Sequence, residues 1–107
     1  MKKERLALVL LLVGVSVVHT ACVTLPPPPV EDYVLARAAI DAAKAIDAAK
    51  YSPGFFHKAE VAYRQAQTFY EEREYDQADD SFVKARRFAE SAENSARLIR
   101  FKNGDVL

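Results

Sequence analysis

The sequence predicts an all-α protein: a short antiparallel three-helix bundle with up-down-up topology, preceded by a signal helix and a proline-rich linker. Three observations support this class. Apolar residues recur at spacings of three and four between residues 31 and 103, which is the period of an α-helix. Alanine, which has the highest helix propensity, fills most of these positions. In this region proline and glycine stand only between or at the ends of the periodic segments.

The first 21 residues have the three parts of a secretory signal. Basic Lys2, Lys3 and Arg5 are followed by an apolar run over residues 6–18, and small Ala21 ends the segment. As a helix this run is roughly 20 Å long, whereas the hydrocarbon core of a bilayer is roughly 30 Å thick. We therefore expect residues 1–21 to be a cleaved signal peptide, with an uncut anchor as the alternative.

Residues 22–30 form a linker that contains four consecutive prolines, Pro26 to Pro29. Such a run favours polyproline II geometry at about 3.1 Å per residue, so it extends for roughly 12 Å. We interpret it as a stiff spacer between residue 22 and the helical domain, which we place at residues 31–103, with residues 104–107 as a tail.

The first helix of the domain is predicted over residues 31–50. Charged residues that alternate in sign lie largely outside its apolar stripe, as expected for a solvated helix face. The residues of the stripe are Leu35, Ala39, Ala42, Ile46 and Ala49.

Ser52 and Pro53 predict the start of the second helix, as an N-cap and a first helical residue, and the helix should end near Arg73. Its predicted apolar side consists of Phe56, Ala59, Ala62 or Tyr63, Ala66, Phe69 and Tyr70.

The third helix should begin at Asp76, which forms a capping pair with Asp79. Asn103 and Gly104 should close it, because both tolerate the left-handed conformation of a helix end. Its stripe consists of Ala78, Phe82, Ala85, Ala89, Ala92, Ala96 and Ile99.

The residues suggest no catalytic site, cofactor or metal. His57 is the only histidine beyond the signal segment, and it has no second ligand or paired base in sequence reach. The acidic residues between Glu71 and Asp80 have the oxygens that Ca²⁺ prefers, but they lack the pattern of a calcium loop and suit a helix start. The signal holds three of 15 basic and one of 15 acidic residues, so the remaining chain has net charge −2, which does not favour nucleic-acid binding.

The third helix is predicted to be longer than its neighbours, at roughly 40 Å against about 30 Å. The surplus falls at its C-terminal end, where Leu98, Ile99 and Phe101 could lack cover. We expect these three residues to bind a protein partner or a second copy of the chain, the alternative being that the end frays or bends back over the bundle.

The N-terminal segment resembles that of a bacterial lipoprotein, with Thr20 and Ala21 directly before the single cysteine, Cys22. The resemblance implies that Cys22 is lipidated and anchors the chain to a membrane. Val23 after the cysteine implies the periplasmic face of the outer membrane, with the inner membrane or the free periplasm as alternatives.

Two further resemblances concern the helices. The spacing of Tyr75, Ala78, Phe82 and Ala85 resembles the second helix of a tetratricopeptide repeat, which implies a repeat-like hairpin. From residue 30 to about residue 98, the alanines together with Tyr51, Pro53 and Tyr75 are similar to the alanine-rich helical domain of unknown function 4398. That family has no established activity, so the resemblance implies an envelope location and a helical fold.

These observations predict a non-enzymatic, membrane-tethered envelope lipoprotein, which acts as a structural or adaptor module through helix–helix contacts. The alternative is a binding module for peptidoglycan or a small envelope ligand, with Tyr63, Tyr70 and Tyr75 exposed in a groove.

Overall fold

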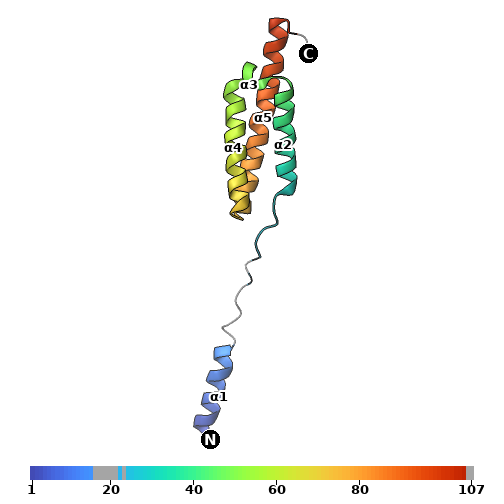
Figure 1. Cartoon of the computed structure of the whole chain (residues 1–107). Coiled ribbons are helices and arrows are strands. Elements are labelled where there is room, and N and C mark those ends of the chain that lie inside the picture. Colours follow the sequence, from blue (N-terminus) through green and yellow to red (C-terminus); the bar gives the residue numbers. More distant parts are fainter. Residues whose placement is uncertain (16–21, 23, 106–107) are drawn as a thin grey trace.

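The fold is all-α, as predicted, and the elements are given by a computed structural model that describes residues 1–15, 22 and 24–105. The predicted cut after Ala21 lies outside the described residues. Within them, the helices are α1 (Lys2–Val15), α2 (Val30–Ala45), α3 (Ala48–Tyr51), α4 (Pro53–Glu71) and α5 (Tyr75–Asn103) (Figure 1).

Helices α2, α4 and α5 lie side by side as a bundle (Figure 1). Helix α2 runs away from the linker, α4 returns toward it, and α5 runs away again, so the chain follows an up-down-up path. Helix α5 packs against both α4 and α2, whereas α2 and α4 contact each other much less. The longest helix is therefore the central element of the bundle.

The core is an alanine seam along α5, and it follows the stripe predicted for the third helix. Small side chains let helix backbones approach closely, which allows one helix to pack against two neighbours. Phe82 is the one large apolar side chain in this seam of small residues. It is the largest fully buried side chain among the described residues. The buried residues of α5 are Ala78, Ser81, Phe82, Ala85, Ala89, Ala92 and Ala96.

The predicted face of α4 is confirmed over most of its length. Phe56, Ala59, Ala62 and Ala66 are buried, as predicted. Phe69 is half-buried and Tyr70 is exposed, so the last part of the predicted face is not in the core. The helix ends at Glu71, two residues before the predicted end. At the other end of α5, Gly104 adopts a φ of 76°, the left-handed conformation expected of a closing glycine.

The predicted stripe of the first helix is wrong by one residue over most of its length. Ile46 is buried, as predicted, but Leu35 and Ala49 are exposed and Ala39 and Ala42 are only half-buried. The buried residues of α2 are Ala36, Ile40 and Ala43, each one position later than a predicted residue. Alanine occupies both candidate stripes, so the period of the sequence did not distinguish them. The isoleucine, which buries more apolar area than an alanine, faces the core.

The predicted continuous helix over residues 31–50 is also wrong, because the chain turns after Ala45. Asp47 adopts a φ of 60°, in the left-handed region that Asp tolerates better than most residues. The turn starts the short helix α3 and places Ile46 and Ala48 in a cluster with Ala92 and Ala96 of α5. Burial of these side chains against α5 offsets the break in the helix.

The predicted caps are only partly present. Ser52 does occupy the N-cap position of α4 and Pro53 the first helical position, but the side chain of Ser52 makes no capping hydrogen bond. The N-cap position of α5 is Glu74, not Asp76, and its side chain makes no capping hydrogen bond. The predicted capping pair of Asp76 and Asp79 is therefore wrong, and the pKa of Asp79 reflects a hydrogen bond to Asp32 of α2 instead.

Helix α1 makes no contact with the other helices in the described part of the chain. No helix among the described residues has both the length and the apolar character needed to cross a membrane.

Candidate functional site

Helix α5 extends beyond α2 and α4 at the end of the bundle opposite the linker (Figure 1). It has 29 residues, against 19 in α4 and 16 in α2. We call its last turn, residues 98–103, the α5 tip. Leu98 is 54% exposed and Phe101 is 83% exposed, while Ile99 is half-buried. Residues three apart share a helix face, so Leu98 and Phe101 form one small apolar patch.

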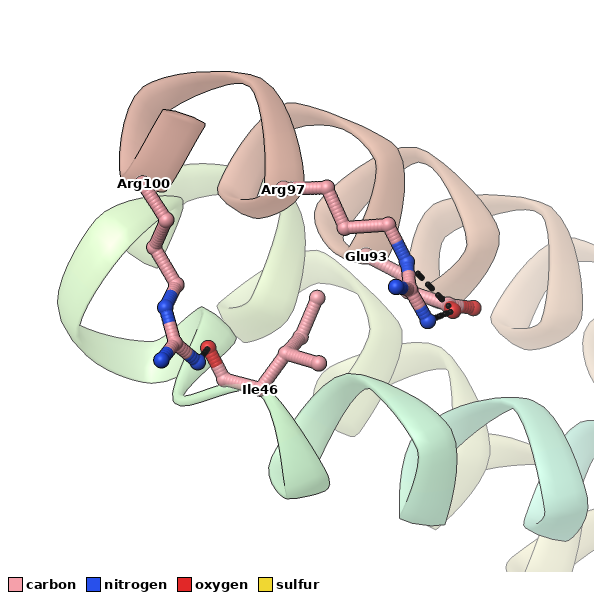
Figure 2. Close-up of polar contacts among 4 residues, drawn as sticks. All are labelled: Ile46, Glu93, Arg97 and Arg100. Carbon is pink, nitrogen blue, oxygen red and sulfur yellow. Dashed lines mark hydrogen bonds and ion pairs between the residues drawn. The ribbon is translucent and has the colours of Figure 1, made fainter. Parts of the chain in front are cut away.

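The side of α5 opposite this patch is attached to the corner between α2 and α3. Arg100 donates a hydrogen bond from Nη1 to the carbonyl oxygen of Ile46 at 3.3 Å (Figure 2). Its guanidinium also lies 5.6 Å from the ring centroid of Tyr51. The Tyr51 hydroxyl in turn donates to Asp105 at 3.0 Å. These contacts hold the base of the α5 tip while its apolar patch faces outward.

Two pockets lie between α2 and α4, and we call the surface that contains both of them the groove. We call the one near the linker the aromatic pocket, with a volume of about 430 Å³, and the one farther along the charged pocket, with a volume of about 240 Å³. The aromatic pocket is lined by Val30, Tyr33, Gln67, Tyr70, Glu71 and Phe82. The charged pocket is lined by Arg37, Ile40, Asp41, Lys44, Glu60, Tyr63 and Arg64.

The rings of the aromatic pocket are arranged around Phe82. The centroids of Tyr33 and Phe82 are 5.5 Å apart at an interplanar angle of 82°, and those of Tyr70 and Phe82 are 6.5 Å apart at 67°. Tyr70 also contacts Tyr75 edge to face at 5.6 Å. Such edge-to-face pairs stabilise the ring positions, so the walls of the pocket are preformed.

The two pockets are joined through Tyr33 and Tyr63, whose rings stack with centroids 6.2 Å apart. A hydrogen bond from Tyr63, and then one from Arg37, lower the pKa of the Tyr33 hydroxyl. Burial, and then the hydrogen bond to Tyr33, raise the pKa of the Tyr63 hydroxyl. The surroundings therefore favour the ionised form of Tyr33 and disfavour that of Tyr63.

Carboxylates gather at the linker end of the bundle. The hydrogen bond to Asp32 raises the pKa of Asp79, with burial and then the negative charges of Asp32, Asp80 and Asp76 adding to the effect. Within the described residues, no three histidine, cysteine or carboxylate side chains are grouped so that they could hold a metal ion. We therefore assign this cluster no metal.

The structure brings only part of the predicted tyrosine set together. Tyr70 lines the aromatic pocket and Tyr63 the charged pocket, whereas Tyr75 packs on Tyr70 and borders a separate depression beside the prolines of the linker. Cys22 and His57 are exposed. The predicted stripe over residues 31–50 omits Tyr33. Its signal is the other stripe, in which Tyr33 precedes Ala36, Ile40 and Ala43 at helical spacing.

A family model described as a domain of unknown function (DUF4398) matches residues 31–102. This range covers the bundle from the first turn of α2 to the α5 tip. The comparisons with curated proteins and with solved structures gave no match.

Proposed function

Since the chain belongs to the DUF4398 family, we propose that it is a non-catalytic adaptor of the bacterial cell envelope. A lipid on Cys22 anchors it to the periplasmic face of the outer membrane. The helical bundle then presents the α5 tip to a protein partner or to a second copy of the chain.

The observation that carries this proposal is the exposed apolar patch of Leu98 and Phe101 on a helix end that extends past its neighbours. Apolar side chains at the outer end of a rigid helix suit helix–helix contact with another protein. Burying a phenylalanine and a leucine at such a contact contributes about 1.5–3 kcal/mol for each side chain.

The position of the linker supports the tethering part of the proposal. Cys22 is exposed, and the bundle begins at Val30. At about 3.1 Å per residue, an extended linker separates the two residues by roughly 25 Å. The α5 tip lies at the far end of the bundle from this linker, so a tethered molecule would hold it away from the membrane (Figure 1).

The tether is tested by expressing the full chain and the Cys22→Ala variant in a bacterial host. Membrane fractionation and intact mass should show an acylated, outer-membrane wild type and an unmodified variant. A soluble wild type without acyl chains would contradict the tether.

The α5 tip is tested by crosslinking and oligomeric-state measurements on the double variant Leu98→Ser with Phe101→Ser. The matched control is Phe55→Ser with Val61→Ser, which removes two apolar side chains that are 42% and 43% exposed on α4. We expect the tip variant alone to lose its crosslinked species. If crosslinked partners and oligomeric state were the same in wild type and tip variant, the adaptor role of the tip would be wrong.

A further inference from the structure

The groove between α2 and α4 is a second surface, independent of the α5 tip. Its aromatic pocket is bordered by Tyr33 from α2, Tyr70 from α4 and Phe82 from α5, at steep angles to one another. Aromatic faces carry partial negative charge and attract cations, most strongly where water is partly excluded. Glu71 adds a carboxylate to the same pocket.

The surroundings of the aromatic pocket are strongly acidic. Across residues 30–36 and 70–83 there is one basic residue, Arg73, and the guanidinium of Arg37 interacts with Tyr33 from the side of the charged pocket. The positive helix N-termini of α2 and α5 compensate about half a charge each, far less than the excess of carboxylates. Asp32, Asp76 and Asp79 border one depression that shares Val30 with the aromatic pocket. The acidic residues in these ranges are Glu31, Asp32, Glu71, Glu72, Glu74, Asp76, Asp79 and Asp80.

The charged pocket has the opposite balance, with three basic and two acidic residues among those that line it. The two pockets are centred about 10 Å apart along α4 and about 13 Å apart along α2, at 1.5 Å per residue. An extended polypeptide covers about 13 Å in four residues, and side chains four residues apart point to the same side of it. The groove therefore presents a negative aromatic end and a positive end at a spacing that suits two oppositely charged side chains of one peptide.

We propose that this groove binds a polypeptide segment of a partner protein. A lysine or arginine of the segment enters the aromatic pocket between Tyr33 and Tyr70, above the buried ring of Phe82 and beside Glu71. An acidic side chain of the segment lies against Arg37, Lys44 or Arg64 in the charged pocket. The separation of the two charges is what favours a peptide, because a lipid headgroup or a single amine has no group that reaches the second pocket.

The probe is the blocked peptide Ala-Lys-Ala-Ala-Ala-Glu-Ala, titrated into the full chain in non-ionic detergent micelles. Carbon-13 labelled tyrosine rings report the site by NMR. We expect the resonances of Tyr33 and Tyr70 to shift and those of Tyr51, at the other end of the bundle, to stay in place. Replacing the lysine by norleucine, which keeps the stem without the charge, should weaken binding by about tenfold.

Matched variants locate the contact. Glu71→Gln should weaken binding of the lysine peptide about three- to tenfold, and Tyr70→Leu should abolish its effect on Tyr33. Glu72→Gln removes the neighbouring exposed charge, which does not line the pocket, and should have a smaller effect. The double variant Leu98→Ser with Phe101→Ser should bind the peptide as wild type does, so failure of the α5 tip hypothesis leaves this one standing. Circular dichroism melts identify any variant that fails to fold.

Three results would overturn the proposal. Equal affinity of the lysine and norleucine peptides would mean that the pocket is simply apolar. Equal losses in Glu71→Gln and Glu72→Gln would mean that only the general acidity of this end matters. Shifts of Tyr33 and Tyr70 with an oligomer of N-acetylglucosamine, but not with the peptide, would assign the groove to a glycan.

Discussion

The guanidinium of Arg100 donates a hydrogen bond at 3.3 Å to the carbonyl oxygen of Ile46, a residue 54 positions earlier in the chain (Figure 2). Ile46 is the C-cap of α2, so its carbonyl is one of those that a helix end leaves without an intrahelical donor. The positive charge also suits the negative end of the α2 dipole. A side chain of α5 thereby fixes the corner at which α2 ends and α3 begins.

We predict that Arg100→Ala destabilises the bundle by about 1–2 kcal/mol, because it removes a charge-assisted hydrogen bond and leaves the Ile46 carbonyl without this donor. The melting temperature in circular dichroism should fall by about 4–8 °C for each kcal/mol. Arg97→Ala is the control, since Arg97 pairs with Glu93 on the same helix at 2.7 Å in a surface pair worth about 0.3–0.5 kcal/mol. Equal losses in both variants would show that the corner contact has no special role.

The alanine seam predicts a strong size limit in the core. Ala89 is fully buried in a cluster with Ile40 of α2 and Ala59 of α4. Ala89→Leu should destabilise by about 1–3 kcal/mol through overpacking, whereas Ala38→Leu, at an exposed position of α2, should change stability by less than about 0.5 kcal/mol. Urea unfolding of the two variants measures both values. An Ala89→Leu variant with the same free energy of unfolding as wild type would mean that the helices can separate to make room for the leucine.

The raised pKa of Asp79 predicts a specific dependence of stability on pH. A carboxyl with a folded pKa above its unfolded value of 3.8 contributes stability that is complete below pH 3.8 and is lost as pH rises through the folded pKa. Asp79→Asn lacks this loss, so its stability relative to wild type should increase with pH across that window. At pH 7 its melting temperature should be higher than that of wild type by roughly 2–4 °C.

The control for Asp79 is Glu72→Gln, which neutralises an exposed carboxylate at the same end of the bundle that does not contribute to the pKa of Asp79, and for which we expect little change. Thermal melts between pH 3 and pH 7 give the difference curves. A difference between Asp79→Asn and wild type that shrank as pH rose would contradict the assignment.

The tyrosine pair in the groove predicts two separate ionisations. Tyr33 should titrate below the usual value of 10.0, because the interaction with Tyr63 and then with Arg37 favours its charged form. Tyr63 should titrate above that value, because burial disfavours its charged form. Tyr63→Phe removes the interaction with Tyr33 and should move the pKa of Tyr33 upward. Ring carbon-13 shifts measured against pH would show it. An unchanged Tyr33 titration would place the dominant influence on Arg37 instead.

Helices α4 and α5 could be predicted closely from the sequence. In both, aromatic residues share a stripe with alanines at spacings of three and four, and no competing stripe of similar character exists. Their bounds deviate by one or two residues, at ends where capping side chains do not act.

Helix α2 was harder to predict because its alanines fill two neighbouring stripes. Whether Leu35 or Ile40 faces the core depends on where α2 lies on α5, which is a tertiary property. The turn at Asp47 has the same origin. Nothing in the local sequence of residues 45–49 breaks a helix, and the burial of Ile46 and Ala48 against α5 decides it.

The two candidate surfaces also differ in how far the sequence predicts them. The length of the third helix predicts the place of the α5 tip, since the surplus over its neighbours must fall at one end. The groove could not be predicted, because Tyr33, Tyr70 and Phe82 are far apart in the chain and belong to three helices. Their assembly depends on the relative rotation of those helices.

The sequence by itself determined the helical class, the linker, the order of the helices and the alanine seam of α5, because these follow from local propensity and from the period of apolar residues along one helix. The tertiary structure decided which face of α2 is buried, where its chain turns, and which rings meet in the groove. These features depend on how side chains of separate helices fit together. In an alanine-rich bundle, many rotations of a helix about its own axis satisfy the local pattern, and a few large buried residues such as Phe82 and Ile40 select one of them.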